Sequence, residues 1–269
     1  MTIKPTKTYI YFFLLVFILS VPFWILGTFV NTTGIFPINL PIAALMLLCP
    51  ITAAIILTRK ADKKNGVKLL LSRVVDYNKI KNPIWYLPTF LLIPILMLSA
   101  CAIMKWLNIP IPKQNVHLID TIILFVLFFI GAICEEVGWT GYVTDPLQSR
   151  YGAFNAALII GTIWAVWHII PYIQAHRTPI WIFWQCLGTV AIRIIIVWLY
   201  NNSGKSLITA ILCHTTVNMS EYLFPNYGSN YDPFYFGIFL IITAFIITYL
   251  WGTKTLVQFR FTNSLKKTL

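Results

Sequence analysis

Residues 121–142 read TIILFVLFFIGAICEEVGWTGY, and this stretch decides which class of fold the chain can adopt. An apolar run without a charged residue ends in two adjacent glutamates, Glu135 and Glu136. The run suits a membrane-spanning helix, but an ionised side chain at bilayer depth costs ~2.5–3.5 kcal/mol even on the gentler insertion scales. Either the segment lies outside the membrane, or the two carboxylates have a function inside it.

The composition of the whole chain favours the membrane. Its 269 residues are 58% hydrophobic and 10% charged, whereas a soluble domain usually has about 25% charged residues. The apolar excess is spread along the chain, which predicts an all-α integral membrane protein with about eight transmembrane helices. The predicted spans, of which the seventh is the shortest and most polar, are Tyr9–Val30, Ile38–Thr58, Tyr86–Leu107, Ile119–Val143, Phe154–Ile173, Ile180–Asn201, Ser206–Tyr222 and Pro233–Trp251.

The positive charges divide unevenly between the two sides of this map. With the N-terminus inside, 16 of the 20 Lys and Arg fall in cytoplasmic segments. The positive-inside rule therefore predicts a multi-pass protein of the cell membrane with both termini in the cytoplasm. No nucleic-acid partner is expected, because the basic residues cluster beside membrane spans without a nucleic-acid motif. The basic loop from Arg59 to Lys81 is interpreted as a solvated segment that faces lipid headgroups.

All five cysteines lie within predicted spans, and they form no CxxC pair. They are Cys49, Cys101, Cys134, Cys186 and Cys213. This distribution does not suit a disulfide scaffold, so they are interpreted as small buried residues.

Polar side chains inside the spans are confined to four consecutive helices. Spans four to seven hold nearly all of them, while spans one, two, three and eight hold almost none. The residues concerned are Glu135, Glu136, His168, Arg193, His214, Asn218 and Glu221. Scattered substitutions would not segregate in this way, so we predict one polar active-site cavity among helices four to seven.

The spacing of these residues places several of them on common helix faces. His214 and Asn218 are four residues apart, and Glu221 joins their face nearer the outer end of the helix. Glu135 and Glu136 are about 100° apart around their helix, so they cannot point in the same direction. One is expected to face the cavity while the other reaches a neighbouring helix.

A carboxylate and imidazoles around a buried water form a plausible hydrolase site. A glutamate can take a proton from water, and a histidine can position that water. A second histidine and an asparagine can donate hydrogen bonds to the oxyanion that forms at an attacked carbonyl. The sequence has neither GxSxG nor HExxH, so the common serine-hydrolase and zinc-protease signatures are absent.

Two segments of the chain resemble a known family. EEVGWTGYVTDPLQSRYGAFNAALIIGTIWAVWHIIPYI and SLITAILCHTTVN are similar to the CPBP family of CAAX proteases and bacteriocin-processing enzymes, also called the Abi family. Each of the three family motifs is weak alone, but all three in order on successive polar spans make a strong match, over about residues 119–222. The motifs EExxxR, FxxxH and HxxxN correspond here to Glu135-Glu136-xxx-Thr140, Trp164-xxx-His168 and His214-xxx-Asn218.

This resemblance implies an intramembrane endopeptidase, whose best-known type cleaves prenylated CAAX proteins. It implies five catalytic residues, Glu135, Glu136, His168, His214 and Asn218. Of these, Glu135 activates water with help from His168, and His214 and Asn218 stabilise the oxyanion. The expected partners are the lipid bilayer and a membrane-associated peptide or lipidated protein substrate. The chain then divides into N-terminal helices with a basic loop (1–118), a CPBP-type catalytic core (119–223) and a C-terminal helix with a basic tail (224–269).

The name metalloprotease is often attached to this family, so a metal site has to be considered. Glu135, His168 and His214 could in principle bind zinc. An oxyanion role for His214 removes one of these ligands, and we therefore expect no tightly bound metal.

The chain departs from the family pattern at two positions. Trp164 replaces a phenylalanine, keeps an aromatic ring and is interpreted mainly as a packing residue. Thr140 replaces the motif arginine, which would lie four residues after Glu136 and could pair with it along the helix. We predict that Arg193 in the sixth span supplies the missing charge to Glu136 from another helix.

Interpretations without catalysis stay open on the sequence alone. His214 and Asn218 can act as interhelical hydrogen-bond groups, a common use of such residues in membranes. Glu221 is interpreted as structural or interfacial. The alternative function is a non-catalytic membrane immunity or regulatory protein on the same scaffold, which the missing motif arginine slightly favours. A proton-coupled transporter lacks support, because the sequence has no inverted repeat.

Overall fold

A computed structural model of the chain describes residues 8–30, 41–62, 65–111, 117–224 and 231–261. Within these ranges the protein is helical and contains no strand, which confirms the predicted all-α class. In chain order the helices are α1 (Thr8–Phe29), η1 (Ile42–Leu47), α2 (Leu48–Ala61), α3 (Gly66–Ser72), η2 (Arg73–Val75), η3 (Tyr77–Lys79), η4 (Pro83–Trp85), α4 (Tyr86–Trp106), α5 (Leu118–Glu136), η5 (Val137–Tyr142), α6 (Thr144–Tyr151), α7 (Ala153–Gln174), α8 (Pro179–Asn202), α9 (Leu207–Leu223) and α10 (Pro233–Trp251).

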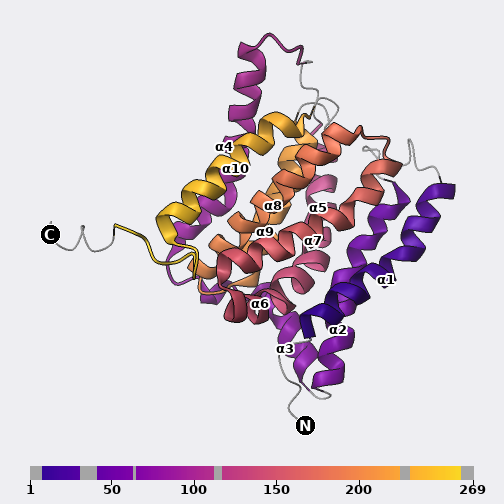
Figure 1. The fold of residues 1–269 in the computed structure, drawn as a ribbon, viewed down its shortest axis with the longest axis vertical. Coiled ribbons are helices and arrows are strands. Elements are labelled where there is room, and N and C mark those ends of the chain that lie inside the picture. Colours follow the sequence, from indigo (N-terminus) through magenta and orange to yellow (C-terminus); the bar gives the residue numbers. More distant parts are fainter. Residues whose placement is uncertain (1–7, 31–40, 63–64, 112–116, 225–230, 262–269) are drawn as a thin grey trace.

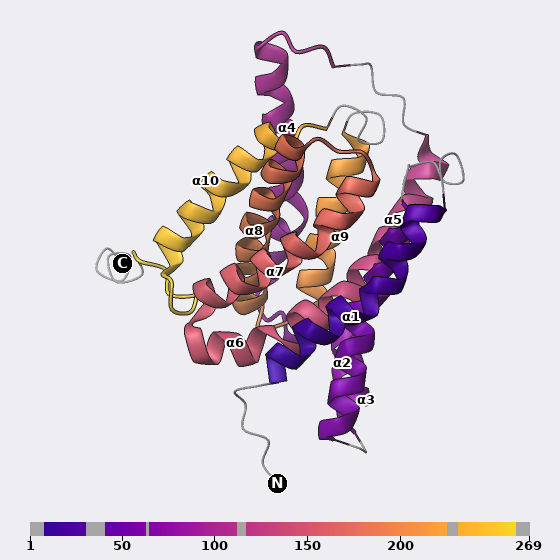
Figure 2. The same cartoon turned by 45° about the vertical axis from the view of Figure 1, so that its right-hand side comes forward.

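The helices form one bundle with α1 and α2 on one side and α4 and α10 on the other (Figure 1). Turning the view by 45° shows α7, α8 and α9 between these two pairs (Figure 2). Seven helical segments of the described chain are long and apolar enough to cross a membrane, which supports a multi-pass membrane protein.

The seventh predicted span, Ser206–Tyr222, corresponds to α9. Its 17 residues fall short of the ~20 residues that a full crossing requires. Helix α9 packs against α4, α5 and α8. Its polar side chains therefore have protein neighbours rather than lipid.

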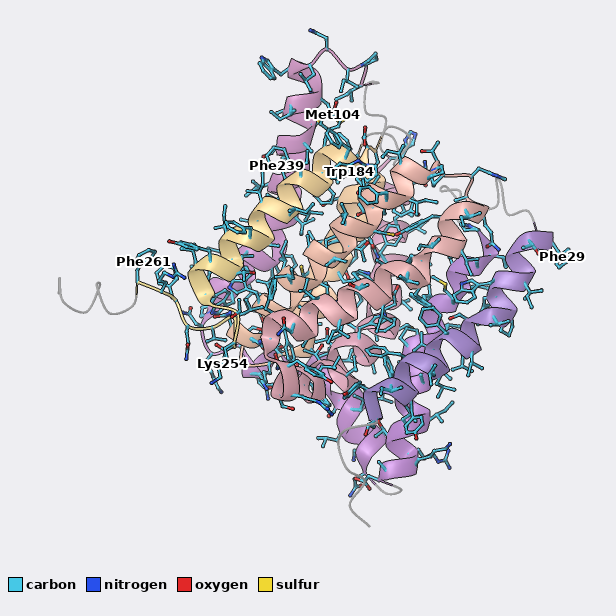
Figure 3. All side chains as sticks on the ribbon, viewed as in Figure 1. Phe29, Met104, Trp184, Phe239, Lys254 and Phe261 are labelled. Carbon is cyan, nitrogen blue, oxygen red and sulfur yellow. The ribbon has the colours of Figure 1, made fainter. Side chains whose placement is uncertain are left out.

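Helix α8 is the central helix of the bundle. It packs against α7 and α10 and also contacts α9, and every residue from Ala191 to Tyr200 is buried. Helix α5 instead exposes large apolar side chains, among them Ile122, which is 55% exposed. An apolar outer surface of this kind suits contact with lipid. Side chains cover the whole described bundle, including its outer faces (Figure 3).

The polar end of α5 continues as a wide π-helical turn, η5. Such turns occur rarely and often at functional sites. Gly138 brings this turn directly against α2, since a Cβ at residue 138 would lie 2.7 Å from the backbone oxygen of Pro50. Glycine therefore permits the close approach that holds the adjacent end of α5 in place.

The basic segment between α2 and α4 is more than a solvated loop. Arg73 donates hydrogen bonds to the Gly141 carbonyl and the Tyr200 hydroxyl, both at 2.6 Å. Asp76 is buried and accepts a hydrogen bond from Ser206 Oγ at 2.9 Å. The prediction of a segment facing headgroups is therefore wrong for Arg73 and Asp76, because both side chains pack against the ends of neighbouring helices.

Several predicted features lie outside the described residues. They are residues 38–40 of the second predicted span and the charged residues Lys4, Lys7, Lys63, Lys64, Lys113, Lys266 and Lys267. The orientation of the termini and the division into three regions stay predictions. The interpretation of the cysteines as buried residues holds for Cys49, Cys134 and Cys213, while Cys101 and Cys186 are partly exposed.

Candidate active site

Glu136 is the last residue of α5 and is fully buried. Arg193 of α8 donates to both of its oxygens, from Nη1 to Oε2 at 2.9 Å and from Nη2 to Oε1 at 3.0 Å. The Thr140 hydroxyl donates to the same carboxylate from η5. The predicted pairing of Arg193 with Glu136 from another helix is confirmed. Such a two-pronged arrangement is the strongest geometry for a guanidinium and a carboxylate, and it fixes their relative orientation.

His214 of α9 contacts the same carboxylate. Its Nδ1 atom lies 2.9 Å from Glu136 Oε1, and its side chain is 3% exposed. An ionised carboxylate only accepts hydrogen bonds, so we assign the hydrogen of this bond to His214 Nδ1. With this assignment, the other ring nitrogen, Nε2, is free to contact a substrate.

Glu135 points to a different helix from Glu136, as the helical geometry predicts. Its Oε2 atom accepts a hydrogen bond from Trp164 Nε1 of α7 at 2.7 Å. The side chain is buried, with 7% of its surface exposed. Adjacent carboxylates thus have separate partners, one neutral and one cationic.

His168 lies one turn after Trp164 on α7. Its Nδ1 atom is 2.9 Å from the Trp164 carbonyl oxygen. A carbonyl oxygen accepts hydrogen bonds, so Nδ1 carries the hydrogen and Nε2 has the lone pair. His168 is therefore arranged as a hydrogen-bond acceptor through Nε2.

Trp164 is the contact shared by these groups. Its ring packs edge-to-face against the rings of His168 and His214, with centroids 5.6 and 5.1 Å apart. The Arg193 guanidinium carbon lies 4.3 Å from the centroid of the Trp164 ring. Interpreting Trp164 mainly as a packing residue missed its hydrogen bond to Glu135, which a phenylalanine could not donate.

Asn218 follows His214 by one turn of α9 and is half-buried. The four-residue spacing places both on one face of the helix. The structure therefore brings Glu135, His168 and His214 together around Trp164, and Glu136 joins them through Arg193 and His214. It places Asn218 on the helix face that carries His214.

A second polar cluster lies further along α9, around Glu221. This carboxylate accepts hydrogen bonds from Gln185 Nε2 of α8 and from the Tyr231 hydroxyl, each at 3.3 Å. The Tyr231 hydroxyl also donates to Gln185 Oε1 at 2.8 Å. These contacts agree with a structural role for Glu221. The sequence pattern gave no sign of Gln185 and Tyr231, because their contact with Glu221 depends on tertiary packing.

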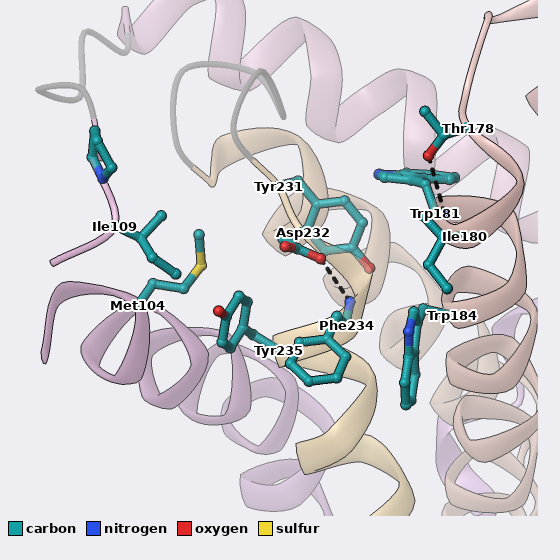
Figure 4. Close-up of a pocket in the computed structure, with 11 residues that line it drawn as sticks. Met104, Ile109, Thr178, Ile180, Trp181, Trp184, Tyr231, Asp232, Phe234 and Tyr235 are labelled. Carbon is teal, nitrogen blue, oxygen red and sulfur yellow. Dashed lines mark hydrogen bonds between the residues drawn. The ribbon is translucent and has the colours of Figure 1, made fainter. Parts of the chain in front are cut away.

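A pocket of about 530 Å³ opens at the end of the bundle where α8 and α10 begin (Figure 4). Its lining includes Met104, Trp181, Trp184 and Tyr235, but none of the predicted catalytic residues. This pocket is therefore distinct from the cavity that the sequence predicts among helices four to seven. The predicted catalytic residues whose contacts are described above form a closely packed polar cluster.

The arrangement of these side chains does not fit a bound metal ion. No group of three or more His, Cys, Asp or Glu side chains in the described ranges is placed to hold one. The alternative of zinc on Glu135, His168 and His214 therefore receives no support from this geometry.

Two comparisons with known proteins match the part of the chain that contains these residues. Residues 117–220 match the family model described as type II CAAX prenyl endopeptidase Rce1-like, a range that contains all five predicted catalytic residues. The chain is also 25% identical over 256 residues to CAAX prenyl protease 2 of Methanococcus maripaludis. That alignment covers 88% of this chain and 92% of the relative.

These matches confirm the predicted resemblance to the CPBP family, and they support the prediction that the protein is a peptidase. Neither description names a metalloprotease or bacteriocin immunity. The alternative of a non-catalytic immunity or regulatory protein is not favoured.

Proposed function

We propose that this protein is an intramembrane endopeptidase that cleaves a peptide bond in a prenylated or otherwise lipidated protein. The matching family, described as CAAX prenyl endopeptidases, and the CAAX prenyl protease of Methanococcus maripaludis support this substrate class. The observation that carries the proposal is the convergence of Glu135, His168 and His214 on Trp164 inside a membrane bundle.

Glu135 and His168 act on the attacking water. The water donates one hydrogen bond to Glu135 and the other to His168 Nε2, which leaves an oxygen lone pair directed at the substrate carbonyl carbon. Glu135 takes the proton as the new carbon–oxygen bond forms, and the carbonyl π electrons move onto its oxygen. Trp164 Nε1 holds Glu135 in position for this step.

His214 and Asn218 stabilise the negative oxygen of the tetrahedral intermediate. The Asn218 amide donates directly. His214 donates from Nε2 as an imidazolium, which is stabilised by the Glu136 carboxylate at Nδ1. The protonated Glu135 then gives its proton to the leaving amine as the carbon–nitrogen bond breaks, and the carboxylate is regenerated.

The same proposal includes the placement of the chain in the cell membrane with both termini in the cytoplasm. The excess of Lys and Arg in the segments assigned to that side supports this orientation. The region 119–223 forms the catalytic core in this scheme, because it contains every residue given a catalytic role.

Asn218→Ala tests the proposed activity directly. Loss of an oxyanion donor is expected to lower kcat about 10²- to 10³-fold. The measurement is release of the C-terminal fragment from a farnesylated peptide ending in a CAAX sequence, with the full-length protein in lipid nanodiscs. Asn155→Ala is the matched control, since Asn155 is exposed on α7 and donates to the backbone carbonyl of Tyr151, the last residue of α6. Equal activity of both variants and the wild type would contradict the oxyanion role.

Trp164→Phe restores the aromatic residue of the family motif but removes the donor to Glu135. A hydrogen bond to a charged group contributes about 1.5–3 kcal/mol, so kcat is expected to fall about 10- to 100-fold. Trp24→Phe is the control, because it removes an indole donor to Met46 Sδ, which is not one of the proposed catalytic residues. Full activity of Trp164→Phe would show that Glu135 does not depend on this bond.

A further inference from the structure

We propose that Arg193 is a positioning residue that orients both halves of the catalytic site, a role that rests on the proposed function. Through Glu136 it orients His214, which belongs to the oxyanion half. Through Trp164 it orients Glu135, which belongs to the half that activates water. The guanidinium itself is fully buried and stands between the two halves.

Arg193 contacts the oxyanion half through a bidentate pair of hydrogen bonds. Both terminal nitrogens of Arg193 donate to Glu136, one to each oxygen, at 2.9 and 3.0 Å. Two parallel bonds fix the plane of the carboxylate, whereas a single ammonium charge would let it rotate. The fixed plane directs Oε1 at His214 Nδ1, 2.9 Å away. The orientation of the His214 ring therefore depends on Arg193.

The contact with the other half is through the face of an aromatic ring. The Arg193 guanidinium carbon lies 4.3 Å from the centroid of the Trp164 ring, within the range of a favourable cation–π contact. The indole Nε1 of the same ring donates to Glu135 Oε2 at 2.7 Å. The guanidinium therefore supports the ring whose edge holds the proposed general base.

The approach of α7 to α8 makes this contact possible. Gly161 lies one turn before Trp164, and a Cβ at residue 161 would lie 3.0 Å from Val190 Cα and 3.1 Å from Arg193 Cβ. A larger residue at 161 would push the two helices apart at this level. Glycine thus lets the Trp164 ring reach the guanidinium.

Thr140 explains how the positive charge that pairs with Glu136 can come from α8 instead of from residue 140. Its hydroxyl donates to Glu136 and also accepts a hydrogen bond from Arg193 Nη1 at 3.3 Å. Residues 140 and 193 thus reach the same carboxylate from two helices. The small threonine leaves space that the guanidinium fills. An exchange of the two side chains would return the arginine to the motif position at nearly constant volume.

The test compares Arg193→Gln, Arg193→Lys and the exchange variant Thr140→Arg/Arg193→Thr, each as the full chain in nanodiscs with the farnesylated CAAX peptide. Misplacement of reacting groups by ~1 Å lowers rates by about 100-fold, so Arg193→Gln is expected to lose about this factor in kcat with KM nearly unchanged. Arg193→Lys keeps the charge without the bidentate pair and is expected to remain impaired. The exchange variant is expected to exceed both in kcat.

Arg73→Gln is the matched control, because Arg73 is a part-buried arginine that donates to Gly141 and Tyr200 instead. It is expected to keep the wild-type kcat. A folded Arg193→Gln with wild-type kcat would overturn the positioning role. So would a folded exchange variant no more active than Arg193→Gln.

A second readout does not depend on activity. With ¹⁵N-labelled histidine, the ring signals of His214, assigned through His214→Gln, are expected to change in Arg193→Gln and return in the exchange variant. Unchanged signals in folded Arg193→Gln overturn the role, whereas an inactive wild type with the expected signals counts against the proposed function alone. If only the exchange variant folds, wild-type His214 signals and measurable kcat support the positioning role, and altered signals without activity overturn it. If none of the three variants folds, Arg193 acts in folding and the positioning role is rejected.

Discussion

Replacing Glu135 with glutamine is expected to lower kcat about 10²- to 10⁴-fold, the usual contribution of a general base. The amide oxygen can still accept the hydrogen bond from Trp164 Nε1, which is 2.7 Å long in the wild type. The local geometry and the stability of the bundle are therefore expected to persist. The amide cannot take a proton from water. Steady-state cleavage of the farnesylated peptide, at equal amounts of folded protein, measures the loss.

Glu221→Gln is the matched control for this experiment. Glu221 also accepts hydrogen bonds from neutral donors, Gln185 and Tyr231, but it lies outside the proposed catalytic set. The same chemical change at this position is expected to leave kcat nearly unchanged. Equal losses in the two variants, or full activity of Glu135→Gln, would show that another group activates the water.

Glu136→Leu is expected to have the largest effect on stability. It leaves the Arg193 guanidinium, which is fully buried, without its carboxylate partner. Removing one member of a buried ion pair lowers the free energy of unfolding by about 3–5 kcal/mol. Denaturant or thermal unfolding of the protein in detergent micelles measures the difference from wild type.

The double variant Glu136→Leu/Arg193→Met separates the unpaired charge from other effects. It is expected to recover most of the lost stability, because apolar residues can replace a buried pair at little cost. Lys205→Gln is the control, since Lys205 and Asp145 form an ion pair with side chains 53% and 38% exposed. Such a pair contributes about 0–1 kcal/mol. A Glu136→Leu variant as stable as Lys205→Gln would contradict the prediction.

The membrane helices could be predicted from the sequence because burial in lipid and burial in protein require the same apolar side chains. Seven of the predicted spans correspond to helices long enough to cross the membrane. Helix α9 is the instructive case, since its polar residues lower its hydropathy although it packs against three other helices. The wide turn η5 could not be predicted, because close packing of Gly138 on Pro50 has no local sequence signal.

The site could be predicted in part for a related reason. An unpaired arginine in an apolar span requires a partner, and the glutamates offered one, so the contact of Arg193 with Glu136 was predictable. The donor role of Trp164 was not, because an indole in a membrane helix usually packs or lies at an interface. Which side chains contact the indole of Trp164 depends on how α7 packs against α8. Such tertiary packing cannot be derived from spacing along one helix.

The position of Arg193 on α8, a later helix than the one that ends at Glu136, also affects insertion of the chain into the membrane. Glu136 and Arg193 are 57 residues apart, so synthesis reaches the carboxylate long before its partner. An arginine at residue 140 would neutralise that charge within a turn of the same helix. Here α5 enters the bilayer with its charge uncompensated, at a cost of ~2.5–3.5 kcal/mol for an ionised group. The guanidinium that removes this cost arrives only with α8, so we expect insertion of α5 and pairing of its carboxylate to be separate steps.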